Sequence, residues 1–122
     1  MTLALLTTVC GVITLAILVA LALAFWTNPA RGLVQTTHRM EQLPLVLADR
    51  YTAFAALALA VILFGDLRLY ATFFAVCAFM GFADGLIYAR AGHPHMKHTL
   101  SGVLSVVALG VSLAALAVEK GS

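Results

Sequence analysis

The chain has 122 residues, of which 63% are hydrophobic and only 10% are charged, and its net charge is +2. Soluble domains carry roughly 25% charged residues, so this composition excludes a water-soluble globule and predicts a membrane protein. The small net charge excludes a strongly basic nucleic-acid-binding protein, and two cysteines are too few for a disulfide-stapled secreted module. We therefore expect the lipid bilayer as a partner and no nucleic acid.

Four apolar segments follow one another along the chain, and each is long enough to cross a bilayer. Their approximate ranges are 3–26, 43–64, 67–89 and 99–118. The segments lack the alternating polarity of the roughly ten-residue strands in a transmembrane barrel. They predict an all-α fold, an integral membrane four-helix bundle that forms a single transmembrane domain over residues 1–122.

Three connections separate these segments. The residue before proline avoids the α region, so Asn28-Pro29 ends the first segment. The connection that follows, 27–42, is either a short helix on the membrane surface, capped by Asn28, or a simple linker. Gly65-Asp66 is short enough only for a tight turn, and residues 90–98 form the third connection. The second and third segments are therefore expected to form an antiparallel hairpin.

Small and polar residues at steps of three and four mark the faces on which we expect the helices to contact one another. These stripes are Thr7, Gly11 and Thr14; Asp49, Ala53, Ala56 and Ala60; Cys77, Gly81, Asp84, Gly85 and Tyr88; and His98, Ser101, Ser105, Ala108 and Ser112. Larger apolar side chains dominate the other faces, as expected for contact with lipid.

Basic residues near the ends of the segments predict the orientation, because cytoplasmic connections are enriched in lysine and arginine. Most of them lie in or beside the first and third connections, namely Arg31, Arg39, Arg50, Arg90 and Lys97, against Arg68 and Lys120 on the other side. This asymmetry predicts that 27–42 and 90–98 face the cytoplasm and that both ends of the sequence face outward. Arg31, Arg39 and Lys97 are candidates for contact with lipid head groups or a partner.

Asp84 is the charge set deepest in a segment. It lies six residues before Arg90, a rise of about 9 Å along a helix. A charge inside a span costs roughly 2.5–3.5 kcal/mol, so Asp84 should either take up a proton or be held ionised by Arg50 or His98. The candidate site residues at this end are Asp49, Arg50, Asp84, Arg90 and His98. They predict a polar pocket that opens toward the cytoplasm or a structural ion pair that fixes the bundle.

Three of the four histidines, His93, His95 and His98, lie close together in the third connection. Imidazoles at such spacing can bind a transition metal. However, Pro94 interrupts the local helix, Lys97 repels a cation, and no Cys, Asp or Glu lies within the cluster. We therefore predict solvated histidines, with no metal and no cofactor.

Several of these residues together resemble a known family. They are Pro29 after the first segment, Asp49-Arg50 opening the second, Asp84 late in the third, and His98 opening the fourth after a glycine-containing turn. In these features the chain is similar to the DoxX-like group of small four-helix bacterial membrane proteins. The resemblance implies a bundle in the bacterial inner (cytoplasmic) membrane, which would put both ends of the sequence in the periplasm, and it implies no specific activity.

Three functional hypotheses follow, and the sequence leaves open whether the protein is an enzyme. The first is a non-enzymatic accessory subunit, or a binder of a small lipophilic or anionic ligand, that meets a membrane-protein partner or a second copy. The second is a membrane-embedded enzyme that performs isomerase-like proton transfer on a lipophilic substrate. Its acid would be Asp84 and its base His98 or His38, while Arg50 or Arg90 would hold an anionic head group. The third is a proton-coupled transporter that acts as a dimer.

Overall fold

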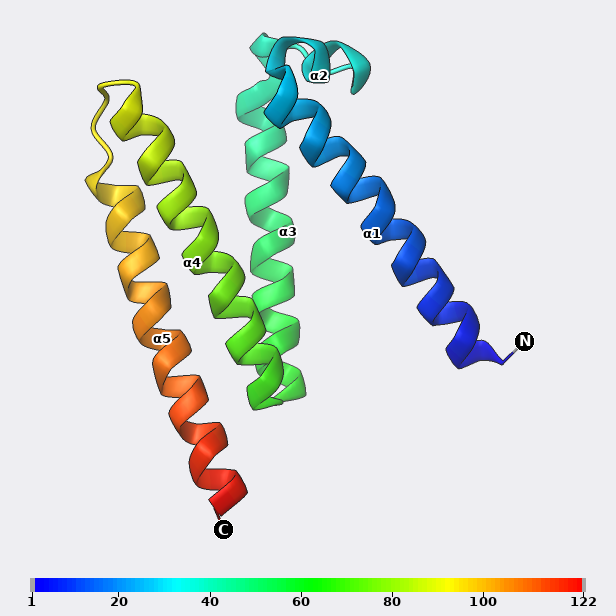
Figure 1. Cartoon of the computed structure of the whole chain (residues 1–122), viewed down its shortest axis with the longest axis vertical. Coiled ribbons are helices and arrows are strands. Elements are labelled where there is room, and N and C mark those ends of the chain that lie inside the picture. Colours follow the sequence, from blue (N-terminus) through cyan, green and yellow to red (C-terminus); the bar gives the residue numbers. More distant parts are fainter. Residues whose placement is uncertain (1, 122) are drawn as a thin grey trace. The chain divides into compact units, whose positions relative to one another are not determined.

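The computed structural model describes residues 2–121, and within them the chain is helical (Figure 1). The elements are α1 (Leu3–Thr27), α2 (Pro29–Gln35), the 3-10 turn η1 (Met40–Gln42), α3 (Leu43–Phe64), α4 (Leu67–Arg90) and α5 (Met96–Gly121). In this part of the chain α1, α3, α4 and α5 are long and apolar enough to cross a membrane. The predicted all-α class is confirmed, and the protein is a small multi-pass membrane protein. The bundle arrangement and the side on which the ends lie stay predictions.

The chain divides into two compact units, Met1–Arg50 and Tyr51–Ser122, with the boundary inside α3. In the first unit, α1 and α2 contact each other. In the second unit, α4 and α5 run side by side in opposite directions over much of their length (Figure 1). The second unit therefore contains the tertiary contact that positions Asp84.

A cap forms the corner between α1 and α2. The Asn28 side chain accepts a hydrogen bond from the Arg31 backbone N–H at 3.1 Å, and Pro29 occupies the first helical position. Both residues behave as the sequence predicts for a short helix, which excludes a plain linker over residues 29–35. A Cβ on Gly32 would lie 2.9 Å from the Phe25 ring, so the ring of α1 covers the backbone of α2 at this point.

The predicted short turn between α3 and α4 is confirmed, whereas within residues 2–121 no contact between the two helices supports the predicted antiparallel hairpin. Gly65 has a φ of +67°, in the left-handed region that favours glycine. The Asp66 carboxylate then caps α4 by accepting a hydrogen bond from the Arg68 backbone N–H at 2.8 Å. The turn thus depends on one residue without a side chain and on one acidic cap.

We expect Gly65→Ala to lower the free energy of unfolding by about 1 kcal/mol, because an L side chain in the left-handed region costs roughly 1–2 kcal/mol. Thermal unfolding in detergent micelles, followed by circular dichroism, measures the change. Gly11→Ala is the matched control: it lies within α1 with open space around its Cβ, so helix propensity should stabilise it by up to about 1 kcal/mol. Changes of the same sign in both variants would contradict the prediction.

Glycines bring α4 and α5 into close contact. A Cβ on Gly81 would lie 2.5 Å from the Gly102 backbone nitrogen and 2.8 Å from its Cα. One turn further along α4, a Cβ on Gly85 would lie 2.7 Å from Thr99 Oγ1. The Phe82 ring covers Gly102 from the side. Membrane helices associate through such close packing because lipid offers no hydrophobic gain.

The stripes predicted for α4 and α5 match this interface with one shift. Gly81, Gly85 and Ser112 are buried, but Ser101 is exposed and Gly102 is buried in its place. Gly102 follows His98 by four residues, whereas Ser101 follows it by three. The stripe was predicted at the polar Ser101, whereas the contact forms at the smaller Gly102.

The stripe predicted for α1 is exposed, as are Asp49, Ala53 and Ala56 of the α3 stripe. Thr7 donates its hydroxyl hydrogen to the Leu3 carbonyl at 2.9 Å, and Thr14 does the same to the Cys10 carbonyl at 2.9 Å. A threonine that satisfies its hydroxyl within its own helix needs no polar neighbour. The contact face predicted for α1 stays a prediction.

Candidate functional site

The candidate site lies where α4 ends and α5 begins. Asp84 Oδ2 on α4 and His98 Nδ1 on α5 are 3.8 Å apart, an ion pair when His98 is protonated. The Asp84 side chain is 50% exposed and that of His98 is 37% exposed. The close contact of Gly81 with α5 positions Asp84 and His98 near each other. A Cβ on Gly81 would also lie only 3.0 Å from the His98 carbonyl oxygen. Arg50 and His98 were the two partners predicted for Asp84. His98 lies beside Asp84 in the second unit, and the role of Arg50 stays a prediction.

Two aromatic rings complete what we term the Asp84–His98 cluster, namely Asp84, Tyr88, His93 and His98. The Tyr88 ring stacks on the His98 imidazole, with centroids 4.9 Å apart and an interplanar angle of 17°. The His93 ring meets Tyr88 edge-on, with centroids 6.4 Å apart. Tyr88 was predicted only as part of a packing stripe, although its position four residues after Asp84 puts both on the same face of α4.

Among the three histidines of the third connection, His95 has a different neighbour from His93 and His98. His95 Nδ1 lies 3.1 Å from Thr99 Oγ1, while the Thr99 hydroxyl donates to the His95 carbonyl, also at 3.1 Å. His93 and His98 instead contact Tyr88. Within residues 2–121, no three His, Cys, Asp or Glu residues are placed to hold a metal ion. The structure therefore does not bring the metal candidates together.

The basic residues at this end are exposed. Arg90 closes the last turn of α4, and Lys97 lies in the first turn of α5. Between residues 84 and 98 the one acidic residue is Asp84 itself. Apart from the Asp84 carboxylate, the charged residues at this end of the α4–α5 pair are therefore basic.

The other predicted site residues lie in the first unit. Asp49 and Arg50 are exposed on α3, and Arg31 and Arg39 are exposed in the first connection. His38 is half-buried, with Nδ1 2.7 Å from Thr36 Oγ1. Their predicted roles toward Asp84, a ligand or lipid head groups stay predictions.

An open groove runs along α5 from Lys97, and we term it the Lys97 groove. Phe74 of α4 forms one wall, and the α5 residues that line it are Lys97, Leu100, Ser101, Leu104, Ser105 and Ala108. Its volume of about 390 Å³ is at the low end of the range for small-molecule sites, roughly 300–1,000 Å³. This groove was not predicted from the sequence, although Lys97, Ser101 and Leu104 share one helical face by their spacing.

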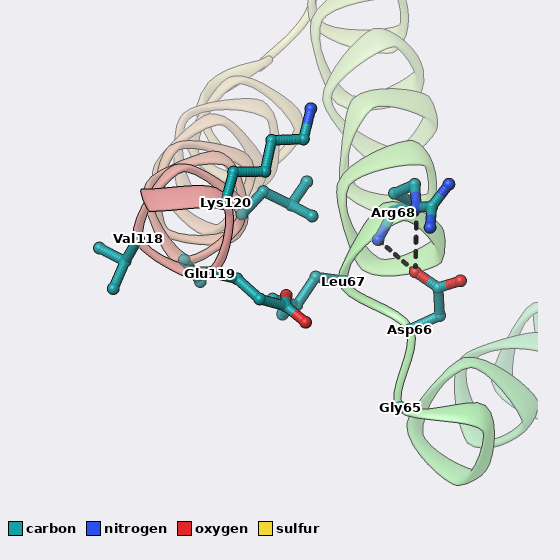
Figure 2. A pocket seen from close by; sticks show the side chains of 9 residues that line it. Gly65, Asp66, Leu67, Arg68, Val118, Glu119 and Lys120 are labelled. Carbon is teal, nitrogen blue, oxygen red and sulfur yellow. Dashed lines mark hydrogen bonds and ion pairs between the residues drawn. The ribbon is translucent and has the colours of Figure 1, made fainter. Parts of the chain in front are cut away.

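A larger hollow, of about 1010 Å³, lies at the opposite end of the pair, and we term it the end groove. It is lined by Gly65, Asp66, Leu67 and Arg68 where α4 begins, and by Ala115, Leu116, Val118, Glu119 and Lys120 where α5 ends (Figure 2). From the sequence, its charged residues were interpreted as ordinary flanks at the membrane interface. The pocket that we predicted beside Asp84 stays a prediction.

No protein-family model, curated protein or solved structure matches the chain. The similarity to DoxX-like proteins therefore rests on the residues that suggested it and stays a prediction.

Proposed function

We propose that the protein is a non-enzymatic membrane protein that binds a small anionic amphiphile at the Asp84 end of the α4–α5 pair. The anionic head group would contact Arg90 and Lys97, and the hydrocarbon chain would lie in the Lys97 groove. The observation that carries this proposal is the position of Lys97 at the end of a groove whose other lining is largely apolar.

The charges of the two ends of the α4–α5 pair support an anion. Arg90 and Lys97 are exposed beside one ionisable pair, whereas the far end carries two acidic and two basic residues. A lysine or arginine near a bilayer surface contributes about 1 kcal/mol of attraction to anionic lipids. Two exposed basic residues against one carboxylate leave this end with a positive formal charge.

The lining of the groove supports a hydrocarbon chain. Lys97 and Ala108 are eleven residues apart, which corresponds to about 16 Å along the helix. Phe74, Leu100 and Leu104 provide apolar surface. Ser105 donates its hydroxyl hydrogen to the Ser101 carbonyl at 2.8 Å, so its only donor is already satisfied. A chain can therefore cover this serine without leaving its donor unpaired.

The same proposal includes the cellular setting. The basic residues in and beside the connections 27–42 and 90–98 favour a cytoplasmic position for both connections. The residues that resemble DoxX-like proteins favour the bacterial inner membrane, with both ends of the sequence in the periplasm. In that orientation Arg90 and Lys97 would face the leaflet that carries the more negative surface potential.

Native mass spectrometry of the detergent-solubilised protein tests the proposal, using phosphatidylglycerol and phosphatidylcholine with identical chains. We expect phosphatidylglycerol to bind more tightly than phosphatidylcholine. The double variant Arg90→Gln/Lys97→Gln should weaken phosphatidylglycerol binding about 30-fold, as two contributions of about 1 kcal/mol predict. Longer chains should also strengthen binding, because they fill more of the groove.

The matched control is Arg90→Lys/Lys97→Arg, which keeps both positive charges at the same positions. It should leave phosphatidylglycerol binding within about twofold of the unmodified protein, because the attraction to an anionic head group depends on the charge. Equal binding of the two lipids by the unmodified protein, or equal losses in both double variants, would contradict the proposal.

A further inference from the structure

The end groove differs from the Lys97 groove in the charges of its lining. Its rim carries both signs of charge, from Asp66 and Arg68 on α4 and from Glu119 and Lys120 on α5. The site proposed above uses none of these residues. The groove therefore requires an explanation separate from the attraction of an anion.

Its charged groups are arranged around the opening between the two helix ends. The Asp66 carboxylate accepts from the Arg68 backbone N–H and lies 3.8 Å from Arg68 Nε, which leaves the guanidinium 84% exposed as a side chain. Figure 2 shows the Glu119 carboxylate turned toward Leu67, and the Lys120 ammonium directed away from it. Asp66 and Arg68 thus form one charged pair on α4, whereas the Glu119 and Lys120 side chains on α5 are turned apart.

The end groove lies at the ends of two candidate membrane spans. Arg68 and Lys120 lie at the first and last turns of helices that are candidate membrane spans, so the rim is expected at the level of the lipid head groups. Below the rim, Leu67, Ala115 and Leu116 provide an apolar lining. A ligand that fits must carry both charges at one end and hydrocarbon at the other.

We propose that the end groove binds a phospholipid whose zwitterionic head group carries a primary ammonium, such as phosphatidylethanolamine. Its phosphate contacts Arg68, whose planar guanidinium matches a phosphate, and Lys120. Its ammonium donates hydrogen bonds to the Asp66 and Glu119 carboxylates. The quaternary ammonium of phosphatidylcholine has no N–H donor, so the groove discriminates between these two zwitterionic lipids.

Native mass spectrometry tests this proposal with phosphatidylethanolamine and phosphatidylcholine of identical chains. The variant is Arg68→Gln/Glu119→Gln, which removes one charge of each sign and leaves the net charge unchanged. We expect about tenfold weaker binding of phosphatidylethanolamine, as the loss of two surface charge contacts predicts. Binding of phosphatidylcholine should weaken only about threefold, because this lipid loses the phosphate contact with Arg68 but has no N–H donor to lose at Glu119. Circular dichroism and thermal unfolding confirm that the variant remains folded.

Glu41→Gln is the control, because it removes an exposed charge that lies outside both grooves. It should bind phosphatidylethanolamine as the unmodified protein does. The proposal is overturned if the unmodified protein binds both zwitterionic lipids equally, if the groove variant loses nothing, or if the control loses as much. The phosphatidylglycerol measurements on Arg90 and Lys97 depend on different residues, so each proposal can fail without the other.

Discussion

Replacing Gly81 with leucine is expected to separate α4 from α5 and to lower the free energy of unfolding by about 3 kcal/mol. The reason is that the nearest atoms are backbone atoms. Even a Cβ at this position would lie 2.5 Å from the Gly102 nitrogen and 2.8 Å from its Cα. A side chain could change its rotamer to make room, whereas these atoms can move only if the whole helix moves.

Gly110→Leu provides a matched control on α5. It introduces the same side chain, but no atom lies within 4 Å of a Cβ at Gly110. This variant should be unchanged or more stable by up to about 1 kcal/mol, because leucine has a higher helix propensity than glycine. Unfolding in detergent micelles, followed by circular dichroism, measures both variants. A loss in Gly110→Leu as large as that in Gly81→Leu would show that the close contact is not the cause.

The second large effect is expected at the Asp84–His98 cluster, where His98→Leu should lower the free energy of unfolding by about 2–3 kcal/mol. Asp84 then loses the imidazole that lies 3.8 Å away. A lone charge within a span costs roughly 2.5–3.5 kcal/mol, which sets the upper limit of the expected loss. Asp84→Leu alone should cost less, because an imidazole can remain neutral near pH 7.

The double variant Asp84→Leu/His98→Leu decides whether the two residues act as a pair. It leaves no ionisable group at this point, so its stability should return to within about 1 kcal/mol of the unmodified protein. Tyr88→Leu controls for the lost ring stacking and should cost no more than about 1.5 kcal/mol. Thermal unfolding in lipid nanodiscs measures the four variants. If the two single effects simply add in the double variant, Asp84 and His98 are not coupled.

Much of the secondary structure was predictable because each signal is local. Length and hydropathy indicated the four long helices, Asn28-Pro29 indicated the start of α2, and Gly65-Asp66 indicated the turn before α4. Each of these features depends only on residues within a few positions of one another.

The candidate site was less predictable because it depends on how α4 and α5 are aligned. Arg50 and His98 were equally good partners for Asp84 in the sequence, and only the alignment of the two helices places His98 at 3.8 Å. The Lys97 groove likewise requires Phe74 to lie beside α5. Neither fact follows from the periodicity of a single helix. At Ser101 and Gly102, periodicity also allowed two choices one residue apart.

The glycine contact between α4 and α5 also bears on the order of folding. The two helices are joined by only residues 91–95, with Gly92 in the left-handed region at a φ of +76°. Contacts between neighbouring elements need little loop closure, and low contact order favours fast formation. We therefore expect α4 and α5 to associate as soon as both are inserted, before contacts between more distant segments form. Asp84 would then meet His98 early, which shortens the time that a carboxylate spends unpaired in the bilayer.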